Sequence, residues 1–219
     1  MRPNHPFDPV SLSTSLSREF PGLNREVLEK YLGEIARWNR ALGLVSKRST
    51  EASLNRLVRQ SVGLWDFLAG ECDRSRDVRP DRVVDIGSGA GFPGVIWKLL
   101  RPEITVVLVD RREKKILFLE RVRTILQLEG IEIASGDAAE LVERQTSYGS
   151  FDVAVTMAVG GPAAIASTAE RFLRGSGYYC TVRPKEEEIP DHIGSHLALA
   201  QTLTTDSGRF CLYRKGEQR

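Results

Sequence analysis

Hydrophobic and polar residues follow two different patterns along the chain, and the change falls near residue 80. Between residues 24 and 69 the apolar residues recur every three or four positions, which predicts helices with one buried face. Gly43 predicts the end of the first of these helices, and a second is expected from about Thr50 to Leu68. The polar segment 70–80 predicts a surface loop. The apolar face of the first helix consists of Tyr31, Ile35, Trp38 and Leu42.

Beyond residue 80, short β-branched segments alternate with helical ones. Strands are expected at 82–85, 104–109, 131–133, 151–155 and 177–182, and helices at 92–100, 112–129, 138–146, 160–173 and 186–199. A final β-hairpin is expected within 203–214. This alternation predicts an α/β fold with a mostly parallel sheet and helices on both faces. We therefore divide the chain into an N-terminal helical extension, 1–80, and an α/β domain, 81–219.

Composition narrows the class of protein. The chain has 219 residues, of which 41% are hydrophobic, so a large core is expected. No apolar segment approaches the roughly 20 residues of a membrane span, and the first residues lack a signal-peptide pattern, so a cytoplasmic monomer without membrane attachment is expected. The cysteines fit neither a disulfide framework nor a metal site, and reduced thiols without a bound metal are expected. They are Cys72, Cys180 and Cys211.

A glycine-rich segment follows the first expected strand. Residues 83–94 read VVDIGSGAGFPG, between a strand and a helix, where α/β sheets bind ligands. A dinucleotide fingerprint requires a third glycine at the position of Phe92, and a phosphate-binding P-loop requires Lys followed by Ser or Thr. The remaining pattern, D-x-G-x-G-x-G, is typical of enzymes that bind S-adenosylmethionine. Its members are Asp85, Gly87, Gly89 and Gly91.

Two acidic residues at later strand ends extend this site. Asp110 follows the second expected strand, at an end predicted to be exposed, where its carboxylate can accept both ribose hydroxyls. Asp137 follows the third strand and can accept the adenine amino group, while the amide of Ala138 donates to a ring nitrogen. Each feature alone has a structural explanation, as a tight turn or a helix N-cap. The three together, in this order, favour a cofactor site.

These motifs give the chain a family resemblance. From roughly Tyr31 to Ile189 it resembles the glucose-inhibited division protein B group, the bacterial 16S ribosomal RNA guanine-N7 methyltransferases. The residues that carry the resemblance are the segment 85–94 with its Phe-Pro-Gly ending, Arg101-Pro102, Asp110, Lys114-Lys115, Phe118-Leu119, and Trp38-Asn39-Arg40 with Leu44 and Ser46. The resemblance implies a class I, Rossmann-like S-adenosylmethionine-dependent methyltransferase acting on small-subunit ribosomal RNA. It also implies that Gly87, Phe92 and the backbone at Ala138 and Ala139 contact the cofactor.

The chain departs from the family pattern on the side expected to face the substrate. Where the family has Arg-His-x-x-Asp-Ser, this chain has Leu57 and Gln60 at the His and Asp positions. Met157 replaces the arginine of Ser-Arg-Ala and is assigned to the cofactor set, and Thr181 aligns with the lysine of Lys-Gly. These changes favour, as alternatives, a methyltransferase with another substrate or a non-catalytic protein that binds cofactor and RNA.

Guanine N7 has a free lone pair, so its methylation needs placement more than a general base. The histidines lie outside the α/β motifs, and Cys180, the one candidate for a carbon-5 nucleophile by location, is expected to be a buried apolar residue. Segment 156–161, which would shape the methyl-transfer mouth, lacks the Asn/Asp-Pro-Pro motif of amino-directed enzymes. A nucleotide-dependent oxidoreductase is a further alternative, disfavoured by Phe92.

Basic residues predict an RNA-binding rim, with an ordinary solvated helix face as the alternative reading. The candidate RNA-binding residues are Arg37, Arg40, Arg56, Arg59, Arg111 and Arg112. Lys47, Arg48, Lys114 and Lys115 accompany them in the sequence. Trp38 and Trp65 fall on apolar faces and are expected in the core.

Overall fold

The computed structural model describes residues 7–46, 50–76, 78–144, 149–157 and 162–216. The helices are α1 (Pro9–Glu19), α2 (Arg25–Leu42), α3 (Thr50–Ser75), α4 (Gly94–Leu100), α5 (Glu113–Ile125), α6 (Ala138–Arg144) and α7 (Pro162–Phe172). The strands are β1 (Arg82–Ile86), β2 (Thr105–Asp110), β3 (Ile131–Ser135), β4 (Phe151–Met157), β5 (Leu173–Arg183), β6 (His192–Ile193), β7 (Leu197–Thr205) and β8 (Gly208–Lys215).

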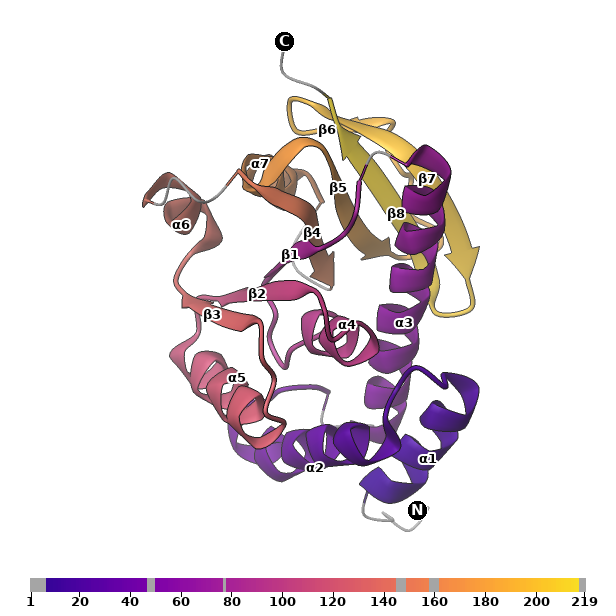
Figure 1. Cartoon of the computed structure of the whole chain (residues 1–219), viewed down its shortest axis with the longest axis vertical. Coiled ribbons are helices and arrows are strands. Elements are labelled where there is room, and N and C mark those ends of the chain that lie inside the picture. Colours follow the sequence, from indigo (N-terminus) through magenta and orange to yellow (C-terminus); the bar gives the residue numbers. More distant parts are fainter. Residues whose placement is uncertain (1–6, 47–49, 77, 145–148, 158–161, 217–219) are drawn as a thin grey trace.

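The strands form one sheet in the order β3-β2-β1-β4-β5-β8-β7-β6. The first five are parallel, whereas β8, β7 and β6 are joined by antiparallel pairing. Neighbouring residues of β1 enter different cores: Val83 belongs to the core that includes residues of α1 to α5, and Val84 to the core that includes residues of α6 and α7. Both faces of the sheet are therefore covered by helices (Figure 1), and the predicted α/β class is confirmed.

The N-terminal helices begin and end where their capping residues require. The Asn24 side chain accepts hydrogen bonds from two amides at the start of α2. Gly43 ends that helix with φ of 55°, as its position in the sequence predicts. Helix α1, for which the sequence pattern gave no assignment, begins with Pro9 after an Asp8 cap.

Two predictions of secondary structure are wrong, one for the end of a helix and one for a whole helix. Segment 70–80 was expected to be a loop, but α3 continues through Ser75 because Leu68 and Cys72 extend its buried face by one more turn. The helix expected at 186–199 does not form: Leu197 begins β7, which pairs with β8 along its length. Burial in β7 alternates between its first residues, as in a strand with one covered face.

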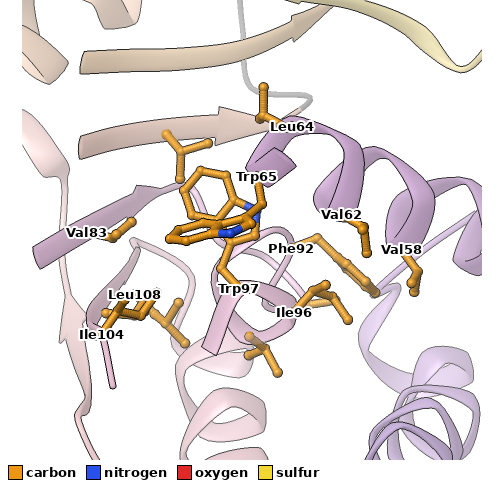
Figure 2. Packing of buried hydrophobic residues seen from close by; sticks show 14 of the residues in the cluster. Val58, Val62, Leu64, Trp65, Val83, Phe92, Ile96, Trp97, Ile104 and Leu108 are labelled. Atoms are coloured by element: carbon orange, nitrogen blue, oxygen red, sulfur yellow. The ribbon is translucent and has the colours of Figure 1, made fainter. Parts of the chain in front are cut away.

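Helices α2 and α3 are attached to the sheet layer by buried polar contacts as well as by apolar packing. The Trp97 indole donates to the Ser61 carbonyl at 2.7 Å, and its ring lies edge-on to Trp65 at 5.3 Å (Figure 2). The Tyr31 hydroxyl donates to the Ala90 carbonyl at 2.7 Å. Trp65 is buried as predicted, whereas Trp38 is half-buried beneath the Arg121 guanidinium.

We expect Tyr31→Phe to lower the free energy of unfolding by about 1 kcal/mol, because the buried Ala90 carbonyl loses its donor. Urea denaturation of the variant and the parent measures the difference. Tyr213→Phe removes a hydroxyl that donates to Pro190, far from α2, and is the matched control for loss of a tyrosine hydroxyl. If Tyr31→Phe and the parent unfold with the same midpoint urea concentration, this contact does not hold α2 in place.

Candidate functional site

A pocket of about 770 Å³ lies at the carboxyl ends of the first parallel strands. One wall consists of residues 86–90 after β1, 109–112 after β2 and 136–139 after β3. The opposite wall comes from the N-terminal helices and the segment between α2 and α3, and includes Leu44 and Leu57. This is the edge at which ligands bind in open α/β sheets.

The glycine loop is folded tightly against β2. The amides of Gly87 and Ser88 both donate to the Val109 carbonyl, at 2.8 and 3.0 Å. Gly87, Gly89 and Gly91 have φ of 77°, 59° and 99°, a region that favours glycine. A Cβ at Gly91 would lie 2.6 Å from a methyl of Val95, so the turn into α4 also requires glycine for space.

Asp85 lies beneath this loop and is fully buried. One carboxylate oxygen accepts from the Gly94 amide at 3.0 Å, and the other has no hydrogen-bond partner within the described part of the chain. Burial raises the pKa of Asp85 well above its usual value, although the hydrogen bond from the Gly94 amide acts in the opposite direction. Burial therefore favours the neutral form of Asp85, which holds the loop through the Gly94 amide.

Asp110 ends β2 with its carboxylate against the glycine loop. It was expected to be exposed, but only 3% of its surface is accessible, because Gly89 and Arg112 enclose it. Burial alone would raise the pKa of Asp110, but hydrogen bonds from the side chain and backbone of Arg112 and from Gly89 outweigh that effect and lower it. The carboxylate is therefore ionised at neutral pH.

The other predicted cofactor residues divide into two groups. Phe92, Asp137, Ala138, Ala139 and Met157 line the pocket, as do Gly87 and Gly89. Asp85 and Gly91 do not line it, and instead support the loop from below. Asp137 also accepts from the Ala139 amide at 2.9 Å, so it caps α6 while standing on the pocket wall.

The predicted RNA-binding arginines are similarly divided. Arg56, Arg111 and Arg112 line the pocket, and all three are exposed. Arg59 pairs with Glu19 and lies over the Phe20 ring at 5.8 Å, so it joins α3 to α1.

Helix α2 carries the remaining two arginines of that set. Arg37 and Arg40 are exposed there and do not line the pocket. Lys47 and Arg48, which accompanied these arginines in the sequence, lie outside the described residues, and so do positions 158–161 of the expected mouth.

Sequence reasoning did not assign residues 44–46, between α2 and α3, to the site. Leu44, Val45 and Ser46 line the pocket, and the Val45 amide donates to the buried Asn39 side chain at 2.8 Å. An asparagine within an otherwise apolar helix face is the signal that could have indicated this loop. Asn39 also contacts Thr50 and so joins the ends of both helices.

Neutral side chains occupy the positions where the chain departs from the family pattern. Leu57 and Met157 line the pocket, and the Met157 sulfur is 3.8 Å from the Ser61 hydroxyl. The Gln60 amide donates to the Ser207 carbonyl, and Thr181 is hydrogen-bonded to Thr156 within the sheet. None of the four positions presents a charge.

Other reactive groups lie away from the pocket. All three cysteines are free and buried, and burial raises the pKa of Cys180 well above its usual value, against a nucleophilic role. His192 and His196 belong to the β6–β7 region, and His5 is outside the described residues. Within the described ranges no group of side chains could hold a metal ion, and no helix is long and apolar enough to cross a membrane.

The sheet order and a glycine loop facing a carboxylate after β2 define a class I S-adenosylmethionine-dependent methyltransferase. Structural comparison supports the fold. A point mutant of MtNAS in complex with S-adenosylmethionine superposes with a TM-score of 0.57 at 15% identity, covering 95% of this chain and 78% of that one. The Escherichia coli protein yhhF, described as a methyltransferase, gives a TM-score of 0.57 at 12% identity, covering 73% and 88%.

Sequence comparison identifies the family. The family model for rRNA small subunit methyltransferase G matches residues 24–213, so the chain belongs to this family. The ribosomal RNA small subunit methyltransferase G of Syntrophotalea carbinolica is 32% identical over 79% of this chain and 74% of its own length. That of Moorella thermoacetica is 32% identical over 69% of this chain, which spans 60% of that relative. The predicted family, its enzyme class and its cofactor, S-adenosylmethionine, are confirmed.

A buried lysine connects this site to α2. Lys115 is 4% exposed, and its ammonium donates to the Gly43 carbonyl at 2.7 Å. Burial, and secondly the nearby Arg112, lower the pKa of Lys115 from 10.5 to about 8. Between these values the unfolded chain binds more protons than the folded one, so the free energy of unfolding rises with pH across this window.

We expect Lys115→Met to remove part of that rise, on the order of 1 kcal/mol between pH 8 and 10. Urea denaturation at several pH values measures it. Lys114→Met, which removes the exposed neighbouring lysine, is the control and should keep the parent's dependence. Parallel pH profiles for the parent and Lys115→Met would contradict the assignment.

Proposed function

We propose that this chain transfers a methyl group from S-adenosylmethionine to guanine N7 of small-subunit ribosomal RNA. The observation that carries the proposal is the convergence, in one pocket, of the glycine loop, the Asp110 carboxylate and the 136–139 turn. Family membership supports the RNA substrate. The proposal treats residues 1–80 as a helical extension and 81–219 as the methyltransferase domain of a monomeric, cytoplasmic enzyme.

The residues of the pocket fit the parts of the cofactor. In this proposal the ionised Asp110 carboxylate accepts the ribose hydroxyls, and Asp137 and Ala138, which line the same pocket, bind the adenine ring. The backbone at Gly87 and Gly89 is open to the methionine part, because neither residue has a side chain.

On the substrate side, the protein has to position the guanine base in line with the methyl group. When bound, S-adenosylmethionine supplies an electrophilic methyl group. The N7 lone pair can attack without prior loss of a proton, so no general base is needed and in-line orientation decides the rate. Leu57 and Leu44, on the wall opposite the glycine loop, give this side an apolar surface against which a base can lie. Arg56 and Arg111, which are exposed at the pocket, are the proposed phosphate contacts.

A methyltransferase with another substrate is the second candidate. It is favoured by the neutral side chains at Leu57, Gln60, Met157 and Thr181, where the family pattern has charged or ionisable ones. A protein that binds cofactor and RNA without catalysis is motivated by the same residues. The three possibilities differ in whether a methyl group is transferred and in which molecule receives it.

Transfer of labelled methyl groups separates them. Small-subunit RNA that lacks 7-methylguanosine is presented both naked and within ribosomal subunits, and the product is identified after digestion to nucleosides. Labelled 7-methylguanosine supports the proposal. Label in another nucleoside indicates a different target, and cofactor binding with no transfer to either substrate indicates a non-catalytic role.

We expect Asp110→Asn to weaken binding of S-adenosylhomocysteine by about tenfold or more, because an amide cannot accept both ribose hydroxyls through charged oxygens. Isothermal titration calorimetry measures the affinity. Glu113→Gln, at an exposed carboxylate three residues along the chain, is the control and should bind as the parent does. Equal affinity of Asp110→Asn and the parent would overturn the cofactor assignment.

A further inference from the structure

Every acceptor position of the Asp110 carboxylate is occupied by the protein itself. One oxygen accepts from the Arg112 amide at 2.9 Å and from Arg112 Nε at 3.1 Å. The other accepts from the Gly89 amide at 3.0 Å and from an Arg112 terminal nitrogen at 3.0 Å. A carboxylate offers about four lone-pair positions, so a ribose diol can bind only where one of these donors leaves.

The four donors differ in how easily they leave. The Gly89 and Arg112 amides belong to the backbone, and the loop that holds Gly89 is fixed by its hydrogen bonds to β2. The Arg112 guanidinium belongs to a long side chain that is 58% exposed, whereas the carboxylate it covers is 3% exposed. Ion pairs with an exposed partner are weak in water, so the guanidinium is the donor that can be displaced.

We propose that Arg112 is a positioning residue that exchanges partners during binding, covering Asp110 until the ribose displaces it and then contacting an RNA phosphate. The inference rests on the proposed cofactor site and adds an order of binding to it. Cofactor binding frees a cation at the mouth of the pocket, beside Arg111. RNA therefore binds more tightly after the cofactor, and by linkage the RNA tightens cofactor binding equally.

The charges around Arg112 support this second role. Arg111 is exposed on the same turn, and Lys115 lies near enough for Arg112 to lower its pKa. Once the guanidinium leaves Asp110, it stands among like charges. A polyanion relieves this repulsion, which favours a phosphate as the new partner.

Calorimetry with S-adenosylhomocysteine tests whether Arg112 competes with the ribose for Asp110. We expect Arg112→Ala to raise the affinity two- to fivefold, because the ribose no longer competes with a guanidinium. Arg112→Lys cannot span both carboxylate oxygens and is expected between Arg112→Ala and the parent. Arg123→Ala removes a half-exposed, ion-paired arginine near the far end of α5, the helix that follows Arg112, and as the control it should leave the affinity unchanged.

Binding of a fluorescent small-subunit ribosomal RNA fragment tests whether the released Arg112 contacts an RNA phosphate. In the parent, saturating S-adenosylhomocysteine should raise RNA affinity threefold or more and steepen its salt dependence by about one phosphate contact. Arg112→Ala should lose both effects, and Arg112→Lys should retain them in part. S-adenosylhomocysteine adds no net charge of its own, so the effect reports the protein's cation.

Failure of this inference can be distinguished from failure of the proposed function. If the parent does not bind S-adenosylhomocysteine at all, the cofactor assignment is wrong. If the parent binds it, but Arg112→Ala binds equally or more weakly, the assignment stands and competition by Arg112 is refuted. RNA affinity that does not depend on the cofactor in the parent refutes the exchange of partners.

Discussion

A buried carboxylate holds the turn between β1 and α4, and the geometry of the pocket follows from that turn. Asp85 accepts from the Gly94 amide nine residues later in the chain, which closes the loop into the start of α4. With the loop closed, the Gly87 and Ser88 amides reach the Val109 carbonyl, and the Gly89 amide reaches Asp110. The carboxylates at the carboxyl ends of β1 and β2 thus determine the position of the same short loop from two sides.

The N-terminal helices complete the site. Tyr31 from α2 donates to the Ala90 carbonyl of the loop, and Trp97 from α4 donates to the Ser61 carbonyl of α3. Both contacts are buried, where an unpaired carbonyl would be costly, so they fix the register between the helices and the sheet layer. The same helices carry Leu44 and Leu57 to the pocket. These contacts therefore connect the wall opposite the glycine loop to the sheet layer that carries the loop.

Local chemistry made much of this predictable. Gly43 ends α2 because it can adopt a left-handed conformation, and the glycine loop follows a β-branched strand, so both were recognisable from neighbouring residues. The helix expected at 186–199 failed because its residues form a strand only through pairing with β8, a partner that local periodicity does not contain. The burial of Asp110 depends on Arg112 folding back over it, and the role of Leu44 depends on where α2 and α3 meet.

The two carboxylates at the loop illustrate how environment separates identical groups. Burial raises the pKa of Asp85, and the charge of Asp110 raises it further, whereas hydrogen bonds from Arg112 and Gly89 lower the pKa of Asp110. Negative charge is thereby concentrated on Asp110, the member that lines the pocket. An RNA phosphate approaching that charge would be repelled unless cations stood between them. Arg111 and Arg112, which are exposed and line the pocket directly after Asp110, supply those cations.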